Sequence, residues 1–160
     1  KTMVEGYIAK ARSIGAHPIL VTSMNRRTFD DTGKIRDTLA PYPQVLRTIA
    51  EEQKLPLIDL NAMSKTMWET MGPEGTLKTF VHYPANTFPG QTAELKDDTH
   101  FNTYGAYELA RCVVESLRTQ KVPLTSELRP GIAPFDPAHP DAVFDLPQSP
   151  MVDTATPYSR

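Results

Sequence analysis

The sequence of 160 residues has one cysteine, little net charge and no long apolar run. Its single cysteine, Cys112, excludes an internal disulfide framework and is predicted to pack in the core. No apolar run approaches the roughly 18 residues that a membrane helix needs. A formal net charge of −2 gives no basic field for nucleic acid or for an anionic membrane. We therefore expect a globular domain whose partners are neither nucleic acid nor a membrane.

The N-terminus lacks an initiator methionine, a signal peptide and a helix cap. Lys1 lies directly inside an amphipathic pattern that predicts a helix. The residues that we expect on the inward face of this helix are Val4, Tyr7, Ile8, Ala11 and Ile14. A chain that opens inside such an element is expected to be the later part of a longer domain.

Two short and continuous apolar runs, 19–23 and 55–60, predict strands of a parallel sheet that is covered on both faces. The patterns that predict further helices are 42–54, 63–71, which Gly72 and Pro73 end, and 103–120. Strands that alternate with helices predict βαβ units with right-handed crossovers, and thus an α/β fold. Two strands are few for such a sheet, which again indicates part of a domain.

Residues 74–99 contain turn residues without a clear period, so we interpret them as a long loop, a kind of segment that is often functional. The domain is expected to span 1–121, because eight of the fifteen prolines lie from Pro123 onward. The proline-rich extension, 122–160, is expected to lie along the surface or to be partly disordered. Its expected apolar anchors are Ile132, Phe135, Val143 and Phe144.

Asp97 and His100 are the candidate catalytic residues, and they stand directly before the last predicted helix. In open α/β sheets, ligands bind where strands lead into loops and helices. A spacing of three residues in a turn can bring a carboxylate to one imidazole nitrogen, which fixes the tautomer and leaves the other nitrogen free to take a proton. This is the base half of a Ser-His-Asp system. By itself the D-x-x-H pattern is short, and His100 in a merely structural role is the alternative.

The residues around this pair read Asp-Asp-Thr-His-Phe-Asn-Thr-Tyr-Gly-Ala from 97 to 106. This block resembles the last block of the SGNH (GDSL-type) hydrolases, and more narrowly that of the rhamnogalacturonan acetylesterase group of carbohydrate esterases. The predicted strands and helices before it match in order, so that the resemblance covers about residues 1 to 120 as a C-terminal portion of the domain.

The resemblance implies a flavodoxin-like three-layer α/β/α fold and serine-dependent removal of acetyl groups from a plant polysaccharide such as rhamnogalacturonan or pectin. His100 would be general base and then general acid, and Asp97 its orienting carboxylate. The family needs no metal or cofactor. Because plant polysaccharides do not enter the cytoplasm intact, the resemblance implies a secreted or periplasmic protein.

The sequence departs from the family by lacking a nucleophile block. It contains no Gly-Asp-Ser and no Gly-x-Ser-x-Gly elbow. The family's oxyanion-hole glycine and asparagine also precede the matched region, and each such donor is typically worth about 2.7–4 kcal/mol. We expect the isolated chain to be nearly inert. Its expected partner is the missing N-terminal portion of the domain, as part of the same polypeptide, a cleaved chain or a partner subunit.

Five residues are candidates for binding the polysaccharide. Asn25 and Arg26, with the neighbouring Arg27, follow the first strand and are expected to line the same edge as His100, although a solvated loop is the alternative. His82, Tyr83 and Phe88 lie in the long loop, where they would form an aromatic wall for a sugar or fix the loop to the core.

Two other patterns do not predict sites. The spacing of the histidines and aspartates matches no metal motif. The stripe of Met63, Met67 and Met71 predicts core packing rather than a ligand surface.

Two other functions stay open from the sequence. Within the enzyme class, the chain could come from another SGNH acyl esterase, lipase or thioesterase, because one fold hosts several acyl specificities. From a different class, it could be a non-catalytic carbohydrate-binding or assembly fragment that keeps the His–Asp pair for structure alone.

Overall fold

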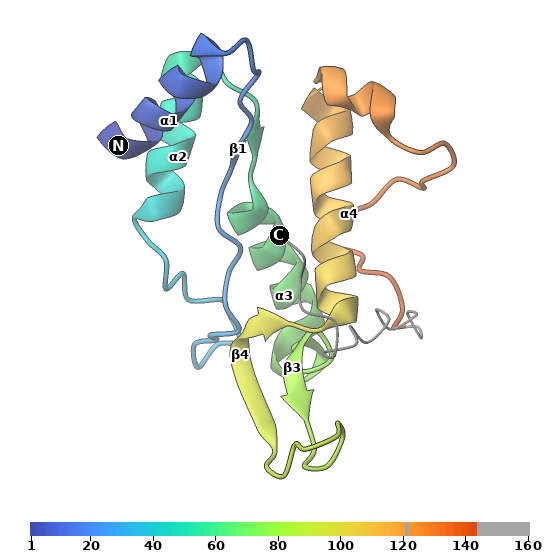
Figure 1. Ribbon diagram of the computed structural model, residues 1–160. Helices are drawn as coiled ribbons and strands as arrows, with labels where there is room; N and C mark the ends of the chain where they lie inside the picture. The colour runs from blue at the N-terminus through green and yellow to red at the C-terminus, as the bar shows by residue number, and fades with distance from the viewer. Residues whose placement is uncertain (121, 144–160) are drawn as a thin grey trace.

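The computed structural model describes residues 1–120 and 122–143 (Figure 1). The chain forms, in order, α1 (Thr2–Ser13), β1 (Leu20–Val21), α2 (Tyr42–Gln53), β2 (Leu57–Ile58), α3 (Leu60–Thr76), β3 (Phe80–Tyr83), β4 (Leu95–Phe101), α4 (Thr103–Gln120) and the 3-10 helix η1 (Pro123–Glu127). β1 pairs with β2 in parallel, and β3 pairs with β4 in an antiparallel hairpin. The predicted mixture of helices and parallel strands is therefore present.

The parallel pair lies between two hydrophobic cores. Leu20 is opposite Leu57, and both pack with α1 and α2, where Ile8 and Ile49 are buried. Ile58, the next residue of β2, packs into the other core, which α3 and α4 build. Successive side chains of a strand point to opposite faces, so the second run is covered on both faces as predicted. In β1, however, Val21 is 46% exposed, so the first run is covered only in part, which the sequence did not predict. The strands are shorter than the predicted runs, at two residues each.

The inward face of α1 is narrower than the pattern predicts. Ile8 is buried and Val4 packs beside it, but Tyr7 and Ile14 are 71% and 73% exposed. Residues four apart share one helical face, whereas Tyr7 lies on its flank. Ile14 lies beyond the last helical residue, Ser13.

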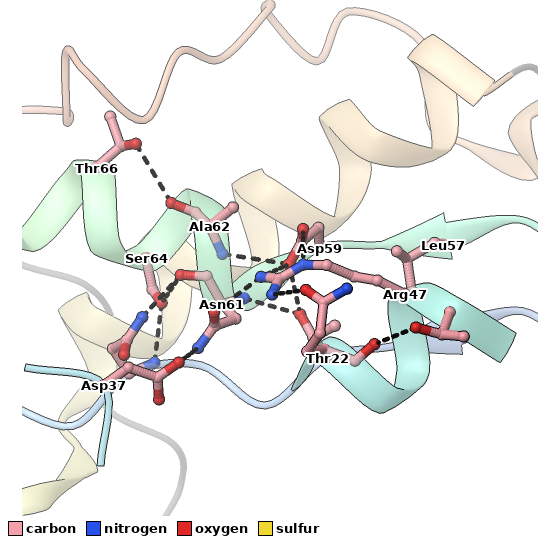
Figure 2. A network of polar contacts seen from close by, with 12 residues as sticks. Thr22, Asp37, Arg47, Leu57, Asp59, Asn61, Ala62, Ser64 and Thr66 are labelled. Carbon is pink, nitrogen blue, oxygen red and sulfur yellow. Dashed lines mark hydrogen bonds and ion pairs between the residues drawn. The ribbon is translucent and has the colours of Figure 1, made fainter. Parts of the chain in front are cut away.

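A polar network ends β2 and begins α3 (Figure 2). The Asp59 carboxylate accepts the backbone N–H of Ala62, which caps α3, and the Thr22 hydroxyl at 2.9 Å. Arg47 of α2 donates to both carboxylate oxygens, at 2.8 and 3.0 Å. Burial raises the pKa of Asp59, but the hydrogen bonds from Arg47 and Thr22 outweigh burial and lower it below its ordinary value. The ionised carboxylate thus joins the carboxyl ends of both strands to α2.

The larger core lies between α3, α4 and the β3–β4 hairpin. Met67 and Trp68 of α3 are fully buried, and the Trp68 ring contacts Phe80 and Phe101 with centroids 5.3 and 5.8 Å apart. Met63 and Met71 pack against the same core, which confirms the predicted role of the methionine stripe. Cys112 of α4 is also buried there, as predicted, and burial raises the pKa of its thiol to about 12.

α3 is interrupted where the sequence predicts its end. Gly72 has φ 70° and ψ 175°, a left-handed conformation that favours glycine. Pro73 follows, and a further helical turn then runs to Thr76. The predicted helix end at Gly72 and Pro73 is therefore a kink rather than a terminus.

Within residues 74–99, the structure assigns 74–76 to α3, 80–83 to β3 and 95–99 to β4, so the predicted long loop is reduced to the connection 84–94 between the two strands. The exposed residues of β4 are mainly charged or polar, so the alternation of apolar residues that predicts a strand is missing. Phe80 and Phe101 face each other at the base of the hairpin, with ring centroids 4.7 Å apart, and fix it to the core.

The described part of the proline-rich extension, 122–143, packs along α4. Phe135 is only 8% exposed and lies beside the Arg111 guanidinium, whose carbon is 5.1 Å from the ring centroid. Ile132 is half-buried, whereas Val143 is 53% exposed and so does not anchor the segment as expected. Phe144 lies outside the described residues. The boundary near 121 stays a prediction. No helix in the described ranges is long and apolar enough to span a bilayer.

Candidate active site

The turn that carries Asp97 and His100 is an irregularity at the end of β4. Asp97 pairs with Val81, and Phe101 pairs with Phe80, so β3 advances by one residue while β4 advances by four. The three residues between Asp97 and Phe101 therefore bulge from the hairpin. The sequence predicts this turn at the end of a loop, whereas the structure places it within a strand.

The Asp97 carboxylate organises this bulge from within. Its Oδ1 accepts the backbone N–H groups of Thr99, at 2.7 Å, and His100, at 2.9 Å. Its Oδ2 lies 2.6 Å from Nδ1 of the His100 imidazole. The backbone N–H of His100, its imidazole and the N–H of Thr99 together lower the pKa of Asp97 to about 2. The contact predicted from the D-x-x-H spacing is present.

This geometry prepares His100 for proton transfer. A carboxylate on Nδ1 favours the tautomer that carries its proton there, so that Nε2 presents a lone pair. The His100 side chain is 76% exposed. Asp97 stays ionised at any pH above about 4, because its pKa lies near 2. It can therefore stabilise an imidazolium when Nε2 takes up a proton.

The chain after His100 is fixed to the base of the hairpin. The Asn102 side chain donates to the carbonyl oxygens of Lys78 and Phe80, and its Oδ1 accepts the backbone N–H of Gly105 at 3.0 Å, which caps α4. Gly105 lies against Thr79 so closely that a Cβ at this position would be 2.1 Å from the Thr79 carbonyl oxygen. The start of α4 therefore locates the turn that precedes it.

The two binding candidates after β1 lie in different environments. The structure buries Asn25, at 1% exposure, where the sequence predicts an open loop. Its side-chain Nδ2 donates to the main-chain carbonyl of Asn61 at 2.7 Å, and the main-chain carbonyl of Asn25 accepts the Trp68 indole N–H. Its Oδ1 has no hydrogen-bond partner among the described residues. Arg26 is exposed, as a solvent-facing loop residue would be.

The other three candidates belong to the hairpin rather than to a free loop. His82 and Tyr83 are in β3, and Phe88 lies in the connection to β4. The Tyr83 and Phe88 rings meet edge to face, with centroids 4.9 Å apart, and Phe88 is 39% exposed. His82 Nε2 lies 2.8 Å from Asp98 Oδ1, next to the candidate catalytic pair. Binding of a sugar by these residues stays a prediction.

Arg27 lies at this edge, as the sequence predicts, but the sequence did not predict its partner, Asp98. Asp98 accepts hydrogen bonds from Arg27, and it neighbours His82. The two adjacent acids at 97 and 98 could have indicated this second contact, because neighbouring side chains of a strand point to opposite faces and so reach different partners. Within the described residues, no group of three or more histidine, cysteine or acidic side chains is placed to hold a metal ion.

The known proteins to which this chain is similar in sequence are named as esterases. Over 118 residues, 74% of this chain, it is 41% identical to the rhamnogalacturonan acetylesterase RhgT of Bacillus subtilis, of which it covers 51%. It is 29% identical over 128 residues, 80% of this chain, to the probable rhamnogalacturonan acetylesterase YesY of the same organism, of which it covers 54%. The chain thus spans about half the length of these relatives. No family model matches it.

Among solved structures, the chain is similar to the crystal structure of the Bacillus subtilis protein YxiM. The TM-score is 0.55 and the sequence identity 32%, over 72% of this chain and 29% of that one. This likeness confirms the predicted fold class, which is a portion of an SGNH-type hydrolase fold. The partial coverage fits a C-terminal portion.

Proposed function

We propose that this chain, whose predicted resemblance to rhamnogalacturonan acetylesterases the comparisons bear out, supplies the histidine and aspartate of a serine-dependent carbohydrate acetylesterase. The observation that carries the proposal is the pairing of the exposed His100 imidazole with an ionised Asp97, at 2.6 Å. A positioned imidazole with a free Nε2 is the general base that ester hydrolysis by a serine requires.

In the proposed reaction, a serine hydroxyl passes its proton to Nε2 of His100 while its oxygen attacks the acetyl carbonyl. The imidazolium, held by Asp97, returns that proton to the sugar oxygen as the ester bond breaks. Water then attacks the acetyl-serine, again with His100 as base, and acetate leaves as the serine is restored. The sugar hydroxyl and acetate are the two products.

The serine and the oxyanion-hole donors of this reaction belong to polypeptide outside the 160 residues. Two observations support this part of the proposal. The sequence contains no Gly-Asp-Ser block, and the chain spans only about half of RhgT and YesY. Without those groups His100 has no nucleophile to activate, so this chain by itself would have almost no esterase activity.

The substrate that we propose is an acetylated rhamnogalacturonan, or a similar pectic polysaccharide, because the names of the two relatives specify that class. Plant polysaccharides do not enter the cytoplasm intact. We therefore propose that the protein acts as a secreted or periplasmic enzyme. The proposed reaction uses only a serine, a histidine, a carboxylate and water.

The test uses the complete polypeptide that contains this chain and measures acetate released from acetylated pectin and from an aryl acetate. His100→Ala should lose nearly all activity on both substrates, by about 10⁴-fold or more, because the general base is removed. Asp97→Asn should lower kcat strongly, because the imidazole loses its orienting partner.

A second Asp–His pair in the same chain provides a matched control. His139 Nδ1 lies 2.8 Å from Asp136 Oδ2 at the same three-residue spacing, and its side chain is 83% exposed. His139→Ala should leave both activities unchanged. Full turnover in the His100→Ala variant would refute the proposed function, as would equal losses in the two histidine variants.

A further inference from the structure

Arg27 joins three segments of the chain at the candidate active site. Its Nη1 donates to Asp98 Oδ1 at 3.0 Å, its Nη2 to the Pro73 carbonyl at 2.7 Å and its Nε to the Thr76 hydroxyl at 3.1 Å. Its own backbone N–H donates to the Asp98 carbonyl at 2.9 Å. The loop after β1, the kinked end of α3 and the bulge of β4 therefore meet at one guanidinium.

These contacts leave Arg27 little capacity to bind a ligand. Its side chain is only 16% exposed, and each of its three nitrogen atoms already donates to a protein oxygen. The Thr76 acceptor is fully buried. A planar guanidinium with fixed donors defines the relative position of its acceptors more closely than a point charge does. The arrangement is thus one of support rather than of recognition.

Asp98 is the point at which this support reaches the catalytic turn. It lies between Asp97 and His100, and it is held through its main-chain carbonyl as well as its carboxylate. Asp97 fixes the turn from within, by its bonds to the N–H groups of Thr99 and His100. Arg27 fixes the same turn from outside. In the described residues, the hydrogen bond of the His100 side chain goes to Asp97, so the direction of Nε2 depends on where this turn is held.

We infer that Arg27 is a positioning residue for His100. Arg27 acts through Asp98 and does not contact the substrate. This inference rests on the proposed function, because it assigns a role within the same reaction. Misplacing a catalytic group by about 1 Å can lower a rate by about 100-fold. Loss of Arg27 should therefore lower kcat while the binding of substrate is preserved.

The test compares Arg27→Ala, Arg27→Lys and His100→Ala in the complete polypeptide, with the aryl acetate as substrate. For Arg27→Ala we expect kcat to fall by about 10- to 100-fold and KM to change by less than about 3-fold. Arg27→Lys keeps the ion pair with Asp98 but not the three directed bonds, so its kcat should lie between those of the parent and Arg27→Ala.

Arg118→Ala is the matched control for a general loss of stability. Arg118 also donates to one carboxylate, that of Glu115, and to two backbone carbonyls, those of Ile132 and Ala133, but on the α4 and extension side of the molecule. Assays run well below the Tm of each variant should show kcat unchanged for Arg118→Ala. The same kcat loss in both arginine variants would overturn the inference, because the effect would then be one of stability.

The two proposals fail in different ways. If His100→Ala is inactive and Arg27→Ala keeps kcat within about 3-fold of the parent, the positioning role is wrong and the proposed function stands. A rise in KM without a fall in kcat would also overturn the inference, because Arg27 would then contact the substrate. If His100→Ala is fully active, the proposed function itself is wrong.

Discussion

The close approach of α4 to the hairpin predicts that Gly105→Ala destabilises the protein. A Cβ at this position would be 2.1 Å from the Thr79 carbonyl oxygen and 2.9 Å from its carbonyl carbon, and real Cβ contacts essentially never fall below 3.0 Å. To remove this clash, the Cβ and the Thr79 carbonyl oxygen must move apart by about 0.9 Å. Both atoms of Thr79 belong to the backbone, so no side-chain rotation can absorb this change.

The expected cost follows from three terms. Overpacking of this kind costs about 1–3 kcal/mol. The displacement also weakens the 3.1 Å hydrogen bond from the Asn102 N–H to the Thr79 carbonyl, a bond worth about 1 kcal/mol. Against these, alanine is favoured over glycine inside a helix by about 1 kcal/mol. The net loss in the free energy of unfolding should be about 1–3 kcal/mol.

Urea unfolding of the parent and of two glycine variants measures this difference. Gly6→Ala is the control, because Gly6 lies inside α1 and a Cβ there meets nothing within 4 Å. It should stabilise the protein by about 0.5–1 kcal/mol through helix propensity alone. If Gly105→Ala is as stable as the parent while Gly6→Ala shows its gain, the reasoning about this contact is refuted.

Three further predictions concern α4 and the segment packed on it. Burial raises the pKa of Glu108 to about 7, so its neutral form contributes stability that is fully present below about pH 4.5 and is lost as the pH rises through 7. Glu108→Gln should therefore flatten the fall in the urea midpoint between pH 5 and pH 8. An identical slope in the variant and the parent would contradict this. Phe135→Ala should lower the free energy of unfolding by about 3 kcal/mol, whereas a loss below about 1 kcal/mol would show that 122–143 does not pack on α4 as described. Cys112, whose thiol pKa burial raises to about 12, should react with iodoacetamide only in denaturant, and rapid labelling of the native protein would contradict its burial.

The sequence predicted best those features that depend on residues close together in the chain. The strand near Leu20 and the helix break at Gly72 follow from local apolar runs and from backbone preferences. The contact between the Asp97 carboxylate and the His100 imidazole likewise spans only three residues, and a bond from the backbone N–H of His100 to the same carboxylate supports it within the turn. Each of these predictions needed no knowledge of the tertiary structure.

The features that were missed depend on residues that are distant in sequence. The hairpin requires Phe80 to meet Phe101 in the core, and no alternation of apolar residues between them announces it. The ion pair of Arg27 with Asp98 spans 71 positions, so nothing local distinguishes Arg27 from a solvated loop residue. Asn25 was predicted to lie in an open loop because it follows the first strand beside two arginines, but the indole N–H of Trp68 requires a buried acceptor.

Trp68 provides an intrinsic fluorescence probe of the region beneath the catalytic turn. It is the single tryptophan of the sequence, and its indole is fully buried. The ring stacks on Phe101, the residue directly after His100, and its N–H is bonded to the Asn25 carbonyl two residues before Arg27. Its fluorescence therefore reports from beneath the catalytic turn. A red shift of its emission in any variant would reveal water reaching this contact, without a label and without a substrate.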